Sequence, residues 1–355
     1  MRKKRALYGS RVRGSTAGIV VVSAVLLLVP GAWQPALAGR LFAPPMKTPG
    51  NRFFFTAAAD LDGDGILDLV GSRHHFDQVA ILPGNGDGTF AFHRQVSVGN
   101  QPGDVLAADL DGDGLAELVV ARPEVSSIKG GVDDVAILRG EPTGDFTLLG
   151  THAVGVDPND LATGDFDDDG ITDLAVANRG WPVLGSEGDV SILLGQGDGG
   201  FKNEIRVATG GQAQAIAVGE VGDEVTVGHN VTLHGDLDGD GHQDLVVARD
   251  ERDAAILVRL GNGDGTFRSP PRFAGEDQAF DVAIADFNQD GKPDVVFVDP
   301  SSFKGVASVF IQLGNGDGTL APPAFFKGGD HSLTLAVDDF NGDGRPDVVT
   351  GTGDG

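Results

Sequence analysis

The chain has 355 residues, of which 55 are glycine, and it contains no cysteine. So many glycines disfavour a helical bundle, because each costs roughly 1 kcal/mol in a helix interior, and the lack of cysteine excludes disulfides and thiolate metal sites. The net charge is −26, and aspartate supplies 43 of the 52 acidic residues. An acidic chain is a poor partner for nucleic acid or anionic lipid, whereas aspartate suits tight turns and oxygen-rich metal sites.

The first 38 residues have the features of an export signal. Six Lys or Arg residues precede an apolar run over about residues 17–29, and Ala36-Leu37-Ala38 forms a small-residue cleavage pattern. This order is typical of a secretory signal, so we expect cleavage after Ala38. The alternative is an uncleaved anchor, which the short run disfavours because a bilayer core is about 30 Å thick. Loss of the six positive charges takes the net charge from −26 to −32. The mature protein would carry no integral membrane segment and would be extracellular, at the cell surface or periplasmic.

Two motifs alternate along residues 39–355. An acidic motif, DLDGDGILD in its first copy, recurs about every 56 residues, at 60–68, 109–117, 165–173, 236–244, 286–294 and 339–347. A glycine-rich motif, GNGDGTF in its first copy, lies between these copies at 84–90, 140–146, 195–201, 261–267 and 314–320. Asn-Gly and Asp-Gly pairs between β-rich runs are typical of hairpin turns. Repeats of this length indicate a solenoid, propeller or array.

Short β-rich runs flank both motifs. Each repeat therefore reads as strand, acidic loop, strand, variable loop, strand, tight turn and strand, and four antiparallel strands in this order form one propeller blade. The strand before each acidic loop is rich in small residues, such as Ala57-Ala58-Ala59, which suits the crowded inner strand of a blade. The sequence predicts an all-β fold over residues 39–355, a β-propeller of six four-stranded blades. Seven blades are the alternative.

The last blade is expected to be incomplete. Only residues 348–350 continue the β pattern after the sixth acidic loop, and the chain stops at Gly355, so a third strand and its turn are missing. Residues 41–45 match residues 320–323 and lie 19 residues before the first acidic loop, as the fourth strands of the other repeats do. We therefore expect residues 41–49 to supply the outer strand of the last blade, with the chain being either a fragment or the remainder of a seven-bladed ring.

The acidic loops have the ligand types of a calcium site. Counting nine positions in each loop, acidic or amide side chains occupy positions 1, 3, 5 and 9, position 6 is always Gly, and position 7 would offer its backbone carbonyl. Ca²⁺ takes six to eight oxygen ligands, whereas Mg²⁺ keeps several waters, and Zn²⁺ prefers sulfur and imidazole ligands. A turn without metal is the alternative, but packed carboxylates repel one another unless a cation neutralises them. About six Ca²⁺ ions are therefore expected.

The predicted metal ligands fall into six groups of five. The first three loops contribute Asp60, Asp62, Asp64, Ile66 and Asp68; Asp109, Asp111, Asp113, Leu115 and Glu117; and Asp165, Asp167, Asp169, Ile171 and Asp173. The last three contribute Asp236, Asp238, Asp240, His242 and Asp244; Asp286, Asn288, Asp290, Lys292 and Asp294; and Asp339, Asn341, Asp343, Arg345 and Asp347. Asn at position 3 of the last two loops and Glu at position 9 of the second predict different affinities. The aspartates of the glycine-rich turns are read as turn residues, not ligands.

This pair of motifs resembles the FG-GAP repeat, also classed as the VCBS repeat in bacterial proteins, and is similar to the calcium-loop blades of the integrin α-subunit propeller. The resemblance covers about residues 40–355. It implies that the matching Asp and Asn residues bind Ca²⁺ on one side of a propeller. It does not fix an activity, because members include adhesion modules, lectins and parts of lyases, and a fold transfers better than a function.

Three classes of function remain. The favoured one is a binding or adhesion module with Ca²⁺ as a structural staple and an extracellular protein or glycan as its partner. A lectin is disfavoured because only Trp181 and no Tyr remain after residue 38 to form sugar platforms. An enzyme such as a polysaccharide lyase is disfavoured because the eight His are scattered and no nucleophile–base motif appears. We expect no catalytic residues.

Ligand recognition is expected on the face opposite the acidic loops. The links between second and third strands, and between blades, emerge there and vary in length, whereas the acidic loops do not. The longer links are residues 122–133 and 178–189, and a 16-residue insertion lies near residues 210–229. Scaffolds often place function in such loops, although unconstrained drift in length is the alternative. Trp181 is the candidate ligand-binding residue, because lone aromatics often anchor interfaces.

Overall fold

The computed structural model describes residues 22–24, 55–87, 89–91, 94–99, 101–123, 133–141, 143–181, 186–218, 235–250, 255–269, 278–299, 308–327, 332–341 and 343–352. Within these ranges the secondary structure consists of 23 β-strands and one short 3-10 turn, η1 (His74–Phe76). The predicted all-β fold is confirmed.

Five sheets each contain four consecutive antiparallel strands. The first is β2 (Thr56–Ala59), β3 (Asp68–Arg73), β4 (Gln78–Leu82) and β5 (Arg94–Ser97), and the second is β6 (Val105–Ala108), β7 (Glu117–Arg122), β8 (Asp134–Gly140) and β9 (Phe146–Ala153). The third is β10 (Pro158–Gly164), β11 (Asp173–Asn178), β12 (Asp189–Leu193) and β13 (Ile205–Ala208). The fourth is β14 (Ala213–Val218), β15 (Leu245–Arg249), β16 (Ile256–Gly261) and β17 (Phe267–Arg268). The fifth is β18 (Asp281–Ala285), β19 (Asp294–Asp299), β20 (Ser308–Gln312) and β21 (Ala324–Lys327).

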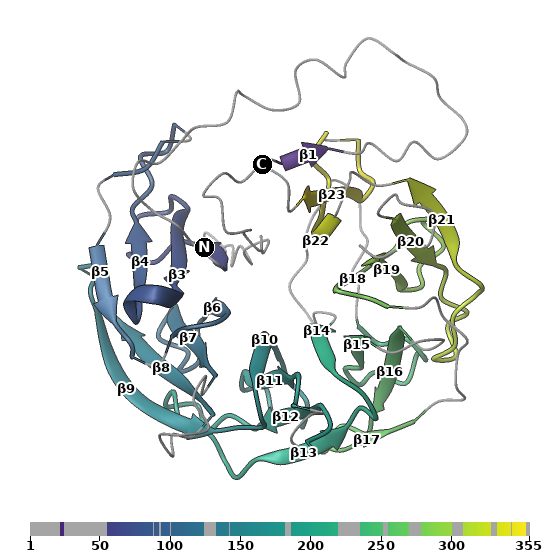
Figure 1. The fold of residues 1–355 in the computed structure, drawn as a ribbon, viewed down its shortest axis with the longest axis horizontal. Coiled ribbons are helices and arrows are strands. Elements are labelled where there is room, and N and C mark those ends of the chain that lie inside the picture. The colour runs from purple at the N-terminus through teal and green to yellow at the C-terminus, as the bar shows by residue number, and fades with distance from the viewer. Residues whose placement is uncertain are drawn as a thin grey trace.

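The sheets stand side by side around a ring, with the first strand of each sheet toward the centre and the fourth at the rim (Figure 1). This arrangement is a β-propeller, in which each sheet is one blade. The inner strands carry small buried residues, as predicted: Ala57 and Ala59 lie on β2 and Ala108 on β6. Small side chains allow the inner strands to converge on the axis.

The core is divided among the blade junctions. Five hydrophobic clusters occur in the described residues, and each joins two neighbouring sheets. Between blades four and five, for example, Phe297 and Phe310 stack with ring centroids 5.0 Å apart, and both are buried against Val246 and Val258. Each blade therefore depends on its neighbours to bury its apolar faces, so the ring is stabilised junction by junction.

The sixth sheet has three strands in the described residues. Its own repeat supplies β22 (Ser332–Asp338) and β23 (Asp347–Thr352), and the third strand is β1 (Val22–Ala24), which pairs antiparallel with β23 from Val22 opposite Gly351 to Ala24 opposite Val349. In this sheet β1 thus occupies the position that the third strand holds in the other sheets. The predicted outer strand at residues 41–49 lies outside the described residues. Cleavage after Ala38 would remove β1.

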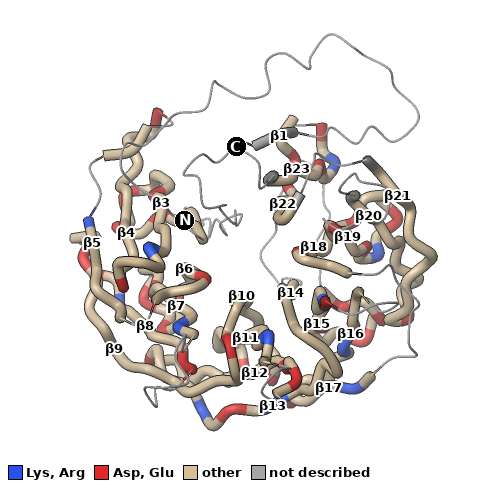
Figure 2. The backbone as a smooth tube through the Cα atoms, in the orientation of Figure 1, with Lys and Arg blue, Asp and Glu red and all other residues tan. Residues whose placement is uncertain are grey.

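Strand alternation places the two motifs on one face. The acidic loops join first to second strands and the glycine-rich turns join third to fourth strands, so both emerge at the same end of each antiparallel blade. The links from second to third strands and from blade to blade emerge at the other end. Figure 2 shows that acidic segments occur in every blade around the ring.

Candidate metal centres

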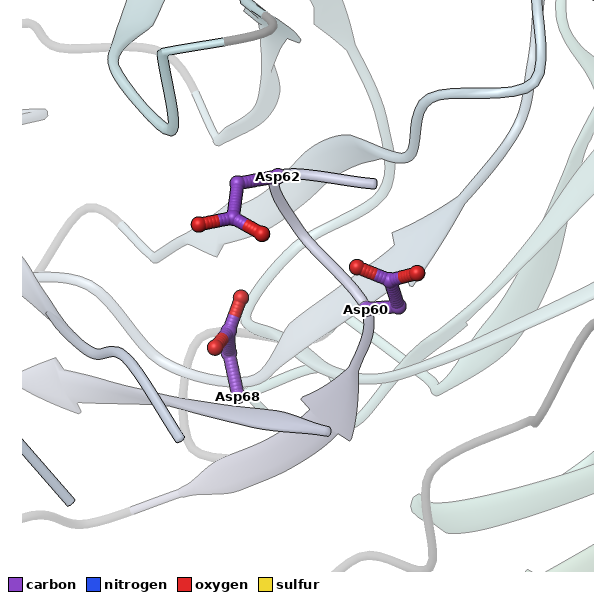
Figure 3. A group of neighbouring side chains, drawn as sticks. All are labelled: Asp60, Asp62 and Asp68. Atoms are coloured by element: carbon purple, nitrogen blue, oxygen red, sulfur yellow. The ribbon is translucent and has the colours of Figure 1, made fainter. Parts of the chain in front are cut away.

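Three carboxylates converge in each of the first four acidic loops. Asp60 and Asp62 come from the loop itself, Asp68 comes from the start of β3, and the three side chains face a common space (Figure 3). In each loop one oxygen from each of positions 1, 3 and 9 lies within 4.8 Å of the others. Two oxygens that each lie about 2.4 Å from one Ca²⁺ ion can be at most about 4.8 Å apart. The groups are Asp60, Asp62, Asp68; Asp109, Asp111, Glu117; Asp165, Asp167, Asp173; and Asp236, Asp238, Asp244.

The loop backbone is wound around its own carboxylates. In the first loop the N–H of Gly65 donates to Asp60 Oδ2 at 2.9 Å, and the N–H of Ile66 donates to Asp64 Oδ1 at 2.8 Å. The same two bonds recur in all six loops. The Gly at position 6 has a positive φ in every loop, 85° at Gly65 and 92° at Gly241, a conformation that favours glycine. The sequence pattern therefore fixes the loop shape locally.

The residue at position 9 is buried in the first five loops, and in four of them it joins the loop to the turn of its blade. Asp68 accepts the N–H of Leu61 at 3.0 Å through Oδ2 and the N–H of Gly84 at 2.8 Å through Oδ1. Asp173, Asp244 and Asp294 make the equivalent pairs of bonds to the loop and to the first glycine of the turn. One carboxylate thus connects the acidic loop with the hairpin turn of the same blade.

Burial raises the pKa of every position-9 carboxyl group, and repulsion from the other loop carboxylates adds to this effect. The pKa of Glu117 and of Asp244 is raised to about 7, and that of Asp173 and of Asp294 to about 6. The pKa values of the corresponding groups in the first and last loops are raised as well. Such groups are costly to ionise unless a cation lies beside them.

Among the described residues, several buried oxygens of the candidate metal ligands have no hydrogen-bond partner. Glu117 is fully buried, and its Oε2 accepts the N–H of Leu110 at 2.9 Å while its Oε1 is unpartnered. The inner Oδ1 atoms of Asp167 and Asp238 are also unpartnered. Unpartnered buried carboxylate oxygens are rare in folded proteins and call for an explanation such as an ion. An all-oxygen set containing such atoms fits Ca²⁺.

The position-5 carboxylates are not part of the three-oxygen groups. The position-5 carboxylates instead cap the N–H of position 7. Two position-7 side chains make other contacts: His242 Nδ1 lies 2.6 Å from Asp168 Oδ2 of the preceding loop, and the Lys292 ammonium donates to the Asn315 carbonyl at 2.8 Å. Calcium ligation by the position-5 side chains and by the position-7 carbonyls therefore stays a prediction.

The last two loops carry Asn at position 3, and its amide donates to a carboxylate of the same loop. A different calcium affinity of these loops stays a prediction. Asn288 Nδ2 donates to Asp290 Oδ2 at 3.1 Å, and Asn341 Nδ2 donates to Asp347 Oδ1 at 3.3 Å. The amide therefore binds a neighbouring carboxylate and lowers the negative charge of its loop. Oδ2 of Asp347 remains buried and unpartnered.

Comparison with known proteins agrees with this repeat geometry. A family model described as the FG-GAP-like repeat matches residues 52–120, 236–297 and 286–350, and the FG-GAP repeat model matches residues 158–193. The chain belongs to the FG-GAP-like repeat family. Human integrin alpha-7 is 32% identical over 152 residues, which cover 37% of this chain and 13% of that integrin. The FG-GAP chain thus matches only a small part of the length of this relative.

A solved structure shares the fold of this FG-GAP protein. It is the crystal structure of a functionally unknown protein from Desulfotomaculum acetoxidans, with a TM-score of 0.50, 10% sequence identity, and coverage of 76% of this chain and 68% of that chain. At this identity the likeness concerns the fold alone. Within the described ranges, the FG-GAP protein has no helix long and apolar enough to cross a membrane.

The aspartates of the glycine-rich turns close their own turns. Asp87 Oδ1 accepts the N–H of Thr89 at 2.9 Å and its hydroxyl at 2.6 Å, and Asp264 and Asp317 contact Thr266 and Thr319 in the same way. These hydrogen bonds lower the pKa of the three carboxyl groups. Their reading as turn residues agrees with this geometry.

The sequence analysis missed the first glycine of each turn. A Cβ at Gly84 would lie 2.2 Å from the Leu67 carbonyl oxygen, and one at Gly314 would lie 2.1 Å from the Pro293 carbonyl oxygen. The turn therefore packs directly against the end of the acidic loop. The signal was present, because all five turn motifs begin with Gly.

Three aspartates that connect neighbouring blades were also not predicted; Asp104 and Asp160 are buried and Asp281 is half-buried. Asp104 accepts the N–H of Leu161 at 3.1 Å, Asp160 accepts that of Ile216 at 2.9 Å, and Asp281 accepts that of Leu335 at 2.9 Å. Each bond runs from the inner strand region of one blade to the inner strand of the next. All three aspartates stand five residues before an acidic loop, a repeated position that could have indicated a shared role.

Trp181 lies in the link between β11 and β12, at the end of the blade opposite the acidic loops. The side chain is half-buried rather than fully exposed, and the backbone carbonyl accepts the N–H of Ser186 at 3.2 Å. Residues 124–132, 182–185 and 219–234, which include most of the predicted variable links, lie outside the described residues.

Proposed function

We propose that this FG-GAP protein is an exported calcium-binding propeller that acts as a binding or adhesion module, with about six Ca²⁺ ions as structural staples. The observation that carries the proposal is the convergence of three carboxylates in four loops, combined with the fully buried, unpartnered Oε1 of Glu117. The oxygen-only chemistry of the loops supports Ca²⁺ over Zn²⁺.

Positions 1, 3 and 9 would hold the ion in each loop, with position 5 and the position-7 carbonyl as further ligands. The ion would supply the positive charge that lets these carboxylates stay ionised while buried. Because position 9 also accepts N–H groups from its loop and its turn, holding it ionised would strengthen the hydrogen bonds that join them. The proposed role of the ion is therefore structural.

Recognition is proposed for the opposite face, with an extracellular protein or glycan as the partner and no catalytic residues. The length variation of the links and the place of Trp181 support this face, and the relation to an integrin α-subunit supports a binding role. Lectin and polysaccharide-lyase activities are the alternatives that a direct assay would detect.

Calcium binding is tested by isothermal titration of the chelator-treated, purified protein with Ca²⁺, and with Mg²⁺ as the comparison ion. We expect heat of binding for several Ca²⁺ ions per chain, with Kd values of about 10⁻⁴–10⁻³ M as in other extracellular modules. Absence of Ca²⁺ binding, or tighter binding of Mg²⁺, would contradict the proposal.

Export and recognition have separate tests. For export, the N-terminal sequence of protein from the culture medium should begin at Gly39.

For recognition, a glycan array and a pull-down from the medium should identify the partner class. Trp181→Ala should then weaken binding more than Asp238→Ala at saturating Ca²⁺. Equal binding by wild type and Trp181→Ala would show that this residue is not part of the recognition surface.

A further inference from the structure

Basic side chains lie on the outer oxygens of three acidic loops. Lys202 Nζ is 3.0 Å from Asp167 Oδ2 and 3.4 Å from Asp169 Oδ2. The Arg268 guanidinium contacts Asp238 Oδ2 and lies 2.8 Å from Asp240 Oδ2. Both cations therefore bridge positions 3 and 5 of the loop in their own blade.

The second loop has a simpler version of this contact. Arg139 lies 2.6 Å from Asp111 Oδ2, at position 3. Lys202 and Arg268 directly follow the closing Phe of their turn motifs, whereas Arg139 directly precedes the turn motif of blade two. The first and fifth turn motifs are followed by Ala91 and Ala321 instead. In the described residues no ion pair reaches the position-3 and position-5 side chains of those two loops.

The two oxygens of a position-3 carboxylate have different surroundings. In Asp167 and Asp238, Oδ2 binds the basic group, whereas Oδ1 is buried and has no partner. The basic group is itself partly exposed, since the Lys202 side chain keeps 44% of its accessible surface. The cation thus neutralises the loop from outside and leaves the inner oxygen free.

We propose that Lys202, Arg268 and Arg139 are built-in counter-ions that lower the calcium affinity of loops two, three and four, so that the ring carries two classes of calcium site. This inference rests on the proposed function, because it assumes that the loops bind Ca²⁺. A fixed positive charge relieves carboxylate repulsion in the calcium-free loop and repels an incoming Ca²⁺ ion. The first loop, without such a charge, binds Ca²⁺ more tightly than the third and fourth.

Lys202→Ala in the purified protein is the test, since the Lys202 ammonium donates hydrogen bonds only to Asp167 and Asp169 among the described contacts. The N–H of the position-6 glycine binds the position-1 carboxylate in each loop, so the glycine amide resonance reports its own site during a Ca²⁺ titration by NMR. Gly170 reports loop three and Gly65 reports loop one.

We expect Lys202→Ala to raise the Ca²⁺ affinity reported by Gly170 about fivefold, the size of a partly exposed charge interaction, and to leave Gly65 unchanged. The same variant should melt at a lower temperature than wild type in chelator, and the difference should shrink in saturating Ca²⁺. A salt bridge with a purely structural role would lower both melting temperatures equally.

Two further variants serve as controls for Lys202→Ala. Lys202→Arg keeps the charge and should keep the wild-type affinity. Arg206→Ala removes an equally exposed cation of the same blade that binds Asp189 and Glu204, away from the acidic loop, and should leave the Gly170 titration unchanged.

An unchanged or lowered affinity at Gly170 in Lys202→Ala, with normal Ca²⁺ binding by wild type, would overturn the counter-ion assignment alone. Absence of Ca²⁺ binding by wild type would overturn the proposed function and this inference together.

Discussion

The acidic loops and the glycine-rich turns are both built from Asp and Gly, and both lie at the same end of each blade, yet their carboxylates do different things. In the turn, Asp264 Oδ1 accepts the N–H of Thr266 at 3.0 Å and also contacts the Thr266 hydroxyl, so a single carboxylate closes its own turn. In the neighbouring loop, Asp236, Asp238 and Asp244 bring three oxygens within 4.8 Å of one another. The spacing of the aspartates, rather than their number, distinguishes a turn from a candidate metal site.

The two motifs also depend on each other. Asp244 Oδ1 accepts the N–H of Gly261, the first residue of the turn, at 2.8 Å. A change in the turn backbone therefore reaches the loop through the carboxylate at position 9.

Removal of calcium should have the largest effect. Each independent site at about 100 times its Kd contributes about 2.7 kcal/mol, so loss of several sites should lower the melting temperature by more than about 10 °C. Differential scanning calorimetry in millimolar Ca²⁺ and in excess chelator measures this change. An unchanged melting temperature would show that the loops need no ion.

The calcium-free protein should lose stability as pH rises. Burial raises the pKa of Glu117 and Asp244 to about 7 and of Asp173 and Asp294 to about 6, whereas the unfolded groups titrate near pH 4. The folded state therefore binds more protons than the unfolded state between these values, and its stability is greatest near pH 4 and falls toward pH 7.

Melting temperatures at pH 5 and pH 7.5 in a chelator that works at both pH values measure this effect. Ca²⁺ should reverse the trend, because protons compete with the ion for the same carboxylates. A calcium-free protein that is more stable at pH 7.5 than at pH 5 would contradict the assignment of these raised pKa values.

Asp244→Ala should destabilise the calcium-bound protein by about 3 kcal/mol, because it removes a ligand and leaves the buried N–H groups of Leu237 and Gly261 unpaired. Urea unfolding in Ca²⁺ measures the loss. Asp244→Asn is the size-matched control and should lose calcium binding with a smaller loss of stability. A loss under 1 kcal/mol for Asp244→Ala would show that position 9 does not join loop and turn.

Gly314→Ala should cost about 2 kcal/mol, because its Cβ would lie 2.1 Å from the Pro293 carbonyl oxygen and the backbone must move. Gly170→Ala is the comparison. Its Cβ would meet no atom within 4 Å, so only the positive φ opposes it, at about 1 kcal/mol. The same unfolding experiment ranks the two variants, and an equal cost would show that the contact between turn and loop is loose.

Asp264→Ala should have the smallest effect. Asp264 is exposed and bonds only within its own turn, so we expect a loss of about 0.5–1 kcal/mol and no change in calcium stoichiometry. If this variant bound one calcium ion fewer per chain, the turn aspartates would have to be counted among the calcium ligands.

The repeats of the sequence were sufficient to predict the β-propeller and the acidic loops that form the candidate site. Repetition of loop and turn at fixed spacing predicted four strands per blade, and five sheets of the structure have four consecutive antiparallel strands. Local chemistry determines these features: Gly at position 6 permits a positive φ, and alternate acidic positions wind the loop around its own carboxylates. Such effects act within nine residues, so they can be read without the fold.

Contacts between distant residues required the tertiary structure. The sequence shows that position 9 is acidic, but only the folded blade shows that Asp68 is buried and joins residues 61 and 84. The contact of Asp104 with Leu161 in the next blade arises from ring geometry. The approach of Lys202 to Asp167, 35 residues away, arises from the pairing of strands within one blade. Burial and cross-blade pairing depend on where whole strands pack, and strand packing is a property of the complete ring rather than of any one repeat.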